Sequence, residues 1–138
     1  MASNVELASL ATRTTTTLNE DKVQPREGPT EATGTPVDLG DDRAVSLALE
    51  AARTQDPTLT LARLTVWIES APAATGPWTL VGEQFDPVDF SRVGVVSQSI
   101  GFTSPGQFLR AHWLIQGNGP SPLEARFGIS GRAVGAAT

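Results

Sequence analysis

The sequence contains no cysteine and a single histidine, His112, among its 138 residues. Without cysteine the chain has no disulfide, no thiolate metal ligand and no cysteine nucleophile. One histidine excludes a metal site built on several imidazoles and leaves only one candidate base for a serine triad. A carboxylate site for calcium or magnesium stays open around Asp38 or Asp86. Neither region has the spacing of a known calcium loop, so we expect no metal and no other cofactor.

The chain is also poor in basic residues and in long apolar runs. Ten bases stand against 15 acids, which gives a formal net charge of −5. Contact with phosphates needs clustered lysine and arginine, so we expect no nucleic-acid partner. No apolar stretch approaches the roughly 20 residues of a membrane-spanning helix, and the N-terminus lacks the basic start and apolar run of a signal peptide. We therefore expect no membrane partner and synthesis in a cytoplasm.

The first 36 residues differ in composition from the remainder. Residues 5–18 combine a short apolar pattern with four consecutive threonines, Thr14, Thr15, Thr16 and Thr17. Because β-branched residues favour extended backbone, we expect a strand or an extended arm here. Residues 19–36 hold three prolines, two glycines and more acids than bases, which indicates a long loop. We interpret residues 1–36 as an N-terminal arm whose strand joins its own sheet or that of a neighbour.

From residue 37 onward, apolar and polar residues alternate in short segments separated by turns. The alternation predicts strands at residues 43–53, 59–69, 78–84, 93–102, 108–116 and 123–134. A helix is the alternative for residues 43–53, because alanine and leucine are good helix formers, but the period of two favours a strand. The clearest core faces in these segments are Leu64, Val66 and Ile68, and Leu109, Ala111, Trp113 and Ile115.

Six short strands with turn signals every ~8–15 residues are typical of an all-β sandwich. Short connections between consecutive strands indicate antiparallel pairing, and strands with one apolar face indicate two sheets around one core. The predicted fold is therefore an all-β, antiparallel two-sheet sandwich over residues 37–138, of the jelly-roll or immunoglobulin-like kind, preceded by the arm of residues 1–36.

The three tryptophans suggest different roles. Trp113 shares a face with apolar residues and is expected in the core, and Trp78 follows a turn and is expected at a sheet edge. Trp67 lies on the polar face of its strand, together with Arg63. A tryptophan on a polar face indicates contact with another chain or a ligand such as a sugar, unless the arm covers it. We take Trp67, Arg63 and the four threonines of the arm as candidate partner contacts.

Three stretches of the sequence resemble one class of protein. They are LTVWIESAPAATGPWTLVGEQF, FLRAHWLIQGNGPSPLEARFGISG, and LASLATRTTTT followed by TPVDLGDDRAVSLALEA. Together they resemble small β-sandwich proteins encoded in the structural-gene clusters of tailed bacteriophages. Two features depart from that pattern: the turn at residues 70–76 lacks an aspartate, and the acidic loop at residues 19–36 is longer.

The resemblance implies a non-enzymatic structural protein of the virion. Within this class, a capsid decoration (cement) protein on the outer shell is the first expectation, with the major capsid protein or other virion proteins as partners. Such proteins often form trimers or other symmetric clusters, so a homo-oligomer is expected. The alternatives are a tail or head–tail connection component, or a carbohydrate-binding module on the same sandwich. The absence of a recognisable nucleophile, base or metal motif in the sequence agrees with a role other than catalysis.

Overall fold

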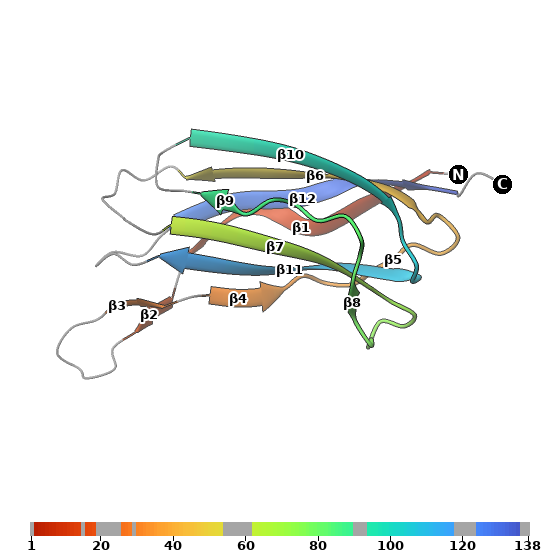
Figure 1. The fold of residues 1–138 in the computed structure, drawn as a ribbon, viewed down its shortest axis with the longest axis horizontal. Coiled ribbons are helices and arrows are strands. Elements are labelled where there is room, and N and C mark those ends of the chain that lie inside the picture. The colour runs from red at the N-terminus through yellow and green to blue at the C-terminus, as the bar shows by residue number, and fades with distance from the viewer. Residues whose placement is uncertain are drawn as a thin grey trace.

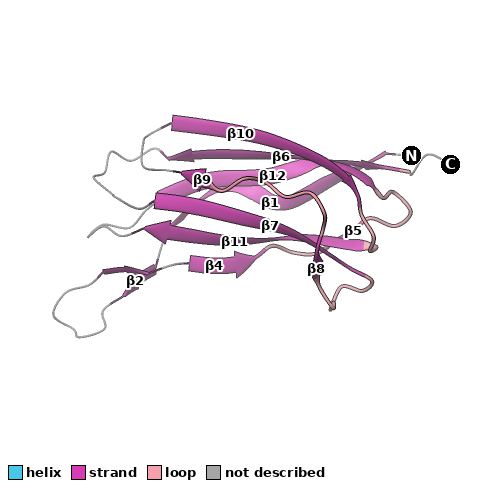
Figure 2. Ribbon diagram, in the orientation of Figure 1, coloured by secondary structure: helices cyan, strands magenta, loops and turns pink. Residues whose placement is uncertain are grey.

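A computed structural model describes residues 2–14, 16–18, 26–28, 30–53, 62–89, 94–117 and 124–135. All regular structure within these residues is β-strand, as Figure 2 shows by colour. No helix in this part of the chain is long and apolar enough to cross a membrane. The strands are β1 (Ala2–Thr14), β2 (Thr16–Leu18), β3 (Arg26–Gly28), β4 (Thr30–Thr33), β5 (Val37–Asp38), β6 (Ala44–Arg53), β7 (Ala62–Ala71), β8 (Thr79–Leu80), β9 (Val88–Asp89), β10 (Gly94–Thr103), β11 (Phe108–Gly117) and β12 (Glu124–Val134).

The long strands form two antiparallel sheets that pack face to face, which confirms the predicted all-β sandwich. The first sheet has the order β1-β12-β6-β10. The second has the order β4-β11-β7-β8, where β5 also pairs with β11 and β9 also pairs with β7. Figure 1 shows β10, β6, β12 and β1 along one side of the molecule and β7, β11 and β4 along the other. Among the described residues, β2 and β3 pair only with each other.

The strand order decides between the two expected kinds of sandwich. From β6 onward the long strands alternate between the sheets, since β6, β10 and β12 lie in the first and β7 and β11 in the second. Each sheet has four strand positions, because β4 and β5 share one edge of β11, and β8 and β9 share one edge of β7. This connection of two four-position sheets is the jelly roll.

The N-terminal residues belong to the sandwich. Strand β1 pairs with β12 from Ala2 to Thr14, with two register shifts along the way. Val5 and Leu7 of β1 are buried in the core. Strand β4 pairs with β11 in the second sheet. Each sheet therefore contains strands from before and after residue 37, where the arm was expected to end. The N-terminal strand pairs within its own chain.

The core between the sheets is formed by the alternating apolar faces that the sequence predicts. Trp113 of the second sheet meets Phe127 of the first edge to face, with ring centroids 5.3 Å apart. Each large side chain buried in this way contributes about 1.5–3 kcal/mol to folding. Besides Val5, Leu7 and Ala8 of β1, the buried apolar residues of the long strands are Val45, Leu47, Leu49, Ala51, Leu64, Val66, Ile68, Ala71, Leu109, Ala111, Trp113, Ile115, Phe127, Ile129 and Ala133.

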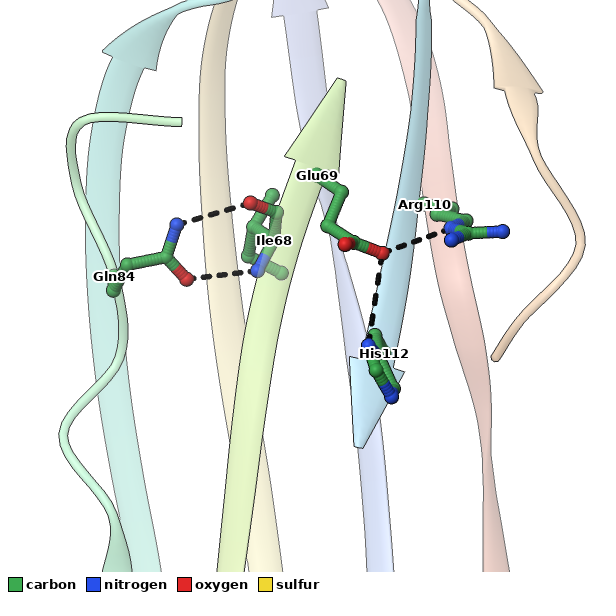
Figure 3. A network of polar contacts seen from close by, with 5 residues as sticks. All are labelled: Ile68, Glu69, Gln84, Arg110 and His112. Carbon is green, nitrogen blue, oxygen red and sulfur yellow. Dashed lines mark hydrogen bonds and ion pairs between the residues drawn. The ribbon is translucent and has the colours of Figure 1, made fainter. Parts of the chain in front are cut away.

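The strand predicted at residues 78–84 is shorter in the structure, where β8 pairs with β7 only at Thr79 and Leu80. Val81 still donates its backbone N–H to the carbonyl of Ile68, at 3.0 Å. Beyond it, the side chain of Gln84 takes the place of a paired strand. Its Oε1 accepts the N–H of Ile68 at 2.8 Å and its Nε2 donates to the carbonyl of Ile68 at 2.9 Å. One carboxamide thus completes the edge of β7 between β8 and β9 (Figure 3).

A second glutamine makes the same kind of contact at the edge of the first sheet. The Oε1 of Gln98, on β10, accepts the backbone N–H of Asp86 at 2.8 Å, and its Nε2 donates to the carbonyl of Asp86 at 3.0 Å. The segment between β8 and β9 is therefore tied to both sheets, to β7 through Gln84 and to β10 through Gln98. These bonds hold this segment against the edge strands of both sheets, β7 with its short partners in the second sheet and β10 in the first.

Candidate functional site

Five polar and aromatic side chains gather on the outward face of the second sheet. We call this group the aromatic–ionic face; its members are Trp67, Glu69, Trp78, Arg110 and His112. Successive residues of a strand point to opposite sides of a sheet. Because Val66 and Ile68 are buried in the core, Trp67 and Glu69 face outward on β7. Arg110 and His112 do the same on β11, between the buried residues of that strand.

The register of the sheet brings these four strand residues together. Glu69 lies directly opposite Arg110, and Trp67 lies directly opposite His112. Side chains opposite each other on one face of an antiparallel pair are within contact distance. Trp78 comes from outside the strand pair, in the segment that precedes β8. The face is thus assembled from three separate parts of the sequence.

An ion pair forms the centre of the face. Arg110 donates its Nε–H to Oε1 of Glu69 at 2.9 Å, and Nδ1 of His112 lies 3.8 Å from the same oxygen (Figure 3). The side chains of Arg110 and Glu69 keep only 23% and 14% of their surface exposed. Partial burial weakens the screening of this pair by salt, and it makes the loss of either partner more costly than at an open surface.

Both tryptophans contact this charged centre. The guanidinium carbon of Arg110 lies 4.3 Å from the centre of the Trp78 ring, which is the geometry of a cation–π contact. The rings of Trp67 and His112 are 5.0 Å apart and tilted by 50°. Arg110 is therefore held on one side by a carboxylate and on another by an indole ring. This arrangement fixes the orientation of a side chain that is otherwise flexible.

The structure distributes the sequence-predicted contact residues over different parts of the fold. Trp67 is partly buried within the aromatic–ionic face. Arg63 is exposed further along β7, where it lies opposite Gln116. The threonines belong to other strands: Thr14 ends β1, Thr16 and Thr17 lie in β2, and Thr15 lies outside the described residues. Thr14 belongs to the first sheet and Trp67 to the second. The role of Trp67, Arg63 and the four threonines as partner contacts stays a prediction.

Sequence reasoning left out three members of the face, namely Glu69, Arg110 and His112. The alternation at residues 108–116 does place Arg110 and His112 on the side opposite the core. This alternation does not indicate which strand lies beside residues 108–116. The pairing of Arg110 with Glu69 could therefore not be predicted from the sequence. Trp78 was expected at a sheet edge, and the structure places its ring against Arg110.

The carboxylate of Asp38 stabilises the turn that follows β5. The backbone N–H of Gly40 and the Nε2–H of Gln107 each donate to Oδ1 of Asp38 at 2.8 Å. The hydrogen bond from Gln107, followed by that from Gly40, lowers the pKa of Asp38 below its ordinary value. Arg43 adds a hydrogen bond from its Nε to the carbonyl of Gly40. In the part of the chain that the structure describes, no three His, Cys, Asp or Glu side chains are placed to hold a metal ion.

Comparison with models of known protein families gives no match for this sequence. Comparison with curated proteins gives none either.

Proposed function

We propose that this protein is a non-enzymatic structural protein of a bacteriophage virion, which decorates the outer capsid shell and binds it through the aromatic–ionic face. The observation that carries the binding role is the group of two tryptophans and an arginine on one outward sheet face. Tryptophan and arginine are the residue types most enriched among the energetically dominant residues of protein interfaces. The virion setting rests on the sequence resemblance of the three stretches given above.

The fixed orientation of the Arg110 side chain supports protein binding. Its guanidinium is already fixed by Glu69 and Trp78, so little side-chain entropy is lost when a partner docks on it. Leu80 lies opposite Glu69 in the register and is 57% exposed. It offers an apolar contact beside the ion pair. A partner that covers this group gains apolar burial and meets a charged pair whose orientation is set in advance.

Carbohydrate binding is the second candidate, because two tryptophans on one sheet face also suit the stacking of sugar rings. One observation separates the two functions. Arg110 lies against the ring of Trp78, so a sugar on that side of the ring has to displace the guanidinium. A protein surface binds beside the guanidinium without displacing it, and this favours a protein partner: the major capsid protein or another virion protein.

The number of copies in purified particles tests the virion role. Quantitative mass spectrometry should find the chain at hundreds of copies per particle if it decorates the shell. A few copies per particle would contradict decoration and favour a tail or head–tail connection role. Absence from the particles would overturn the virion proposal in any form.

Substitution tests the face itself. Trp67→Ala should lower the occupancy of particles at limiting protein by at least tenfold, because truncation of a tryptophan at the centre of an interface costs about 2 kcal/mol or more. Glu83→Ala, at an exposed position between β8 and β9, is the control and should bind as the wild type does. Equal binding of Trp67→Ala and wild type would show that the face is not the contact. Retained particle binding together with glycan-array signals that depend on Trp67 would favour the sugar alternative.

A further inference from the structure

The outward face of the first sheet differs in chemistry from the aromatic–ionic face. The structure describes four large apolar side chains that are strongly exposed, and three of them lie on this face. Leu10 of β1 is 48% exposed, Val95 of β10 is 71% exposed and Val134 of β12 is 43% exposed. Val95 lies opposite Ala52 and Val134 opposite Ala44, so these two side chains stand at opposite ends of the face.

One end of this face is a shallow trough of about 720 Å³ across β10, β6 and β12, lined by the first half of β6 and the last parts of β10 and β12. The side chains that line it are small, so the backbone of the sheet lies near the surface, and a flat partner such as another sheet can approach closely. The outward-pointing small residues of the trough are Ala44, Ser46, Ala48, Ser99, Gly101 and Ser130.

Charged residues line two adjoining hollows of this face, which share Ala48 and Ser130. Arg132 lines the trough, directly opposite Ser46. Four residues away on the same strand, Gly128 lies opposite Glu50, and both residues line a second hollow of about 240 Å³. The carboxylate-bearing residues Glu6 and Glu50 line that hollow. A β-carbon at Gly128 would lie 2.9 Å from the α-carbon of Leu10, so glycine lets β1 approach and keeps the hollow free of a side chain.

We propose that a second copy of this chain docks on the first sheet face to face, with Arg132 of each copy entering the Glu6–Glu50 hollow of the other. A two-fold axis generates both contacts at once, because an isologous interface uses the same patch twice. This inference concerns the sheet opposite the aromatic–ionic face, and it does not depend on the virion role.

The charges of the face favour a second copy as the occupant. The chain as a whole carries a net charge of −5, which opposes self-association. Within residues 4–10, 44–52, 95–103 and 126–134 of the four strands, the charged residues on the outward side are two acids and two bases: Glu6, Glu50, Arg126 and Arg132. This part of the face is therefore neutral, and it presents a base and an acidic hollow that match each other across a two-fold axis.

The area of the face determines how tightly we expect two copies to bind. Four strands at a spacing of about 4.8 Å and ten residues at about 3.3 Å each cover roughly 600 Å² per copy. The total of roughly 1,200 Å² lies at the lower end of the range for specific interfaces. We therefore expect a reversible dimer with a dissociation constant in the micromolar range. Added salt should raise this constant, because it screens the charged contacts.

Charge reversal tests the contact, measured by sedimentation equilibrium over a range of protein concentrations. Arg132→Glu alone and Glu50→Arg alone should each raise the dissociation constant at least tenfold, because each change places like charges at two symmetric contacts. An equimolar mixture of the two variants should form a heterodimer of near wild-type strength, because each contact then joins a glutamate to an arginine. Glu83→Arg, an exposed reversal between β8 and β9, is the matched control and should dimerise as the wild type does.

The mixing experiment separates the contact from damage to the fold. A variant that fails to fold is not rescued by a second variant, whereas a variant that only lacks its partner charge is. A wild-type protein that stays monomeric up to about millimolar concentration would overturn the proposal. A dimer that survives both reversals would overturn it as well, as would two variants that stay monomeric when mixed. The particle copy number and the Trp67→Ala result are independent of each of these outcomes.

Discussion

Replacement of Gln84 by alanine should open the edge of β7. In the wild type, the Gln84 carboxamide accepts one hydrogen bond from the N–H of Ile68 and donates two, to the carbonyls of Ile68 and Val81, all between 2.8 and 2.9 Å. A neutral hydrogen bond contributes about 1 kcal/mol to stability, and water replaces part of that at a partly buried edge. We expect Gln84→Ala to lower the free energy of unfolding by about 2–3 kcal/mol.

Thermal unfolding and amide exchange measure this effect. For a domain of this size, 1 kcal/mol corresponds to roughly 3–4 °C in Tm, so Gln84→Ala should lower Tm by about 6–12 °C. The backbone amide of Ile68 should exchange faster by a larger factor than the amides of β11, because only the edge contact is lost. Gln98→Ala is the matched comparison. It removes two hydrogen bonds at an exposed position, so its effect should be smaller, at about 1 kcal/mol.

The isosteric change Gln84→Glu tests the direction of the hydrogen bonds. A carboxylate still accepts the N–H of Ile68, but it meets the carbonyls of Ile68 and Val81 with an oxygen in place of a donor. Its pKa in the folded state should therefore be raised, and the stability deficit relative to wild type should be full at pH 7 and shrink as pH falls towards about 4. A Tm within about 2 °C of wild type for Gln84→Ala, or a Gln84→Glu protein as stable as wild type at pH 7, would refute this account of the sheet edge.

Two further predictions concern the core and the turn beside it. Leu109 is fully buried between the sheets, so Leu109→Ala should lower the free energy of unfolding by about 2–5 kcal/mol in urea titrations. A loss below about 1 kcal/mol would show that this part of the core is loosely packed. The lowered pKa of Asp38 implies that its contribution to stability is present above the unfolded pKa of about 4 and is lost as pH falls through the lower folded value. The stability difference between wild type and Asp38→Asn should be constant above about pH 5 and shrink below pH 4; a difference that stays constant down to pH 2 would contradict the hydrogen bonds from Gln107 and Gly40.

The period of two along the sequence was enough to predict the long strands from residue 43 onward and their core faces, whereas for β1 the sequence left a strand or an extended arm open. Leu64, Val66 and Ile68 are buried as predicted, and so are the four residues predicted for the core face of residues 108–116. Periodicity reports which residues share a side of a strand, and burial follows from that alone. The short strands β5 and β9 have no such signal, because two residues are too few to show a period. The end of β8 after Leu80 depends on a side chain, Gln84, whose partner lies 16 residues away.

The candidate site was predicted only in part for a related reason. Trp67 is conspicuous because a tryptophan on a polar face is unusual, and one strand is enough to see it. The contacts of Arg110 with Glu69 and with Trp78 join residues more than 30 positions apart. They exist because β11 lies beside β7 in one particular register, and register is a property of two strands. The jelly-roll order of the sheets was likewise left open by the sequence, since alternation is the same in either kind of sandwich.

The two proposed contacts lie on opposite sheets, and this has a consequence for binding. If two copies meet through the first sheet, the second sheet of each copy forms an outer surface of the dimer. The two aromatic–ionic faces then point away from each other and cannot both reach one flat patch of a partner surface. A dimer of this kind joins two partners, or two distant positions on a curved one, and gains affinity only where their spacing matches its own thickness. Decoration of a shell by single dimers lying flat would thus use one face per dimer and leave the other, with its Trp67 and Arg110, free to hold a further protein.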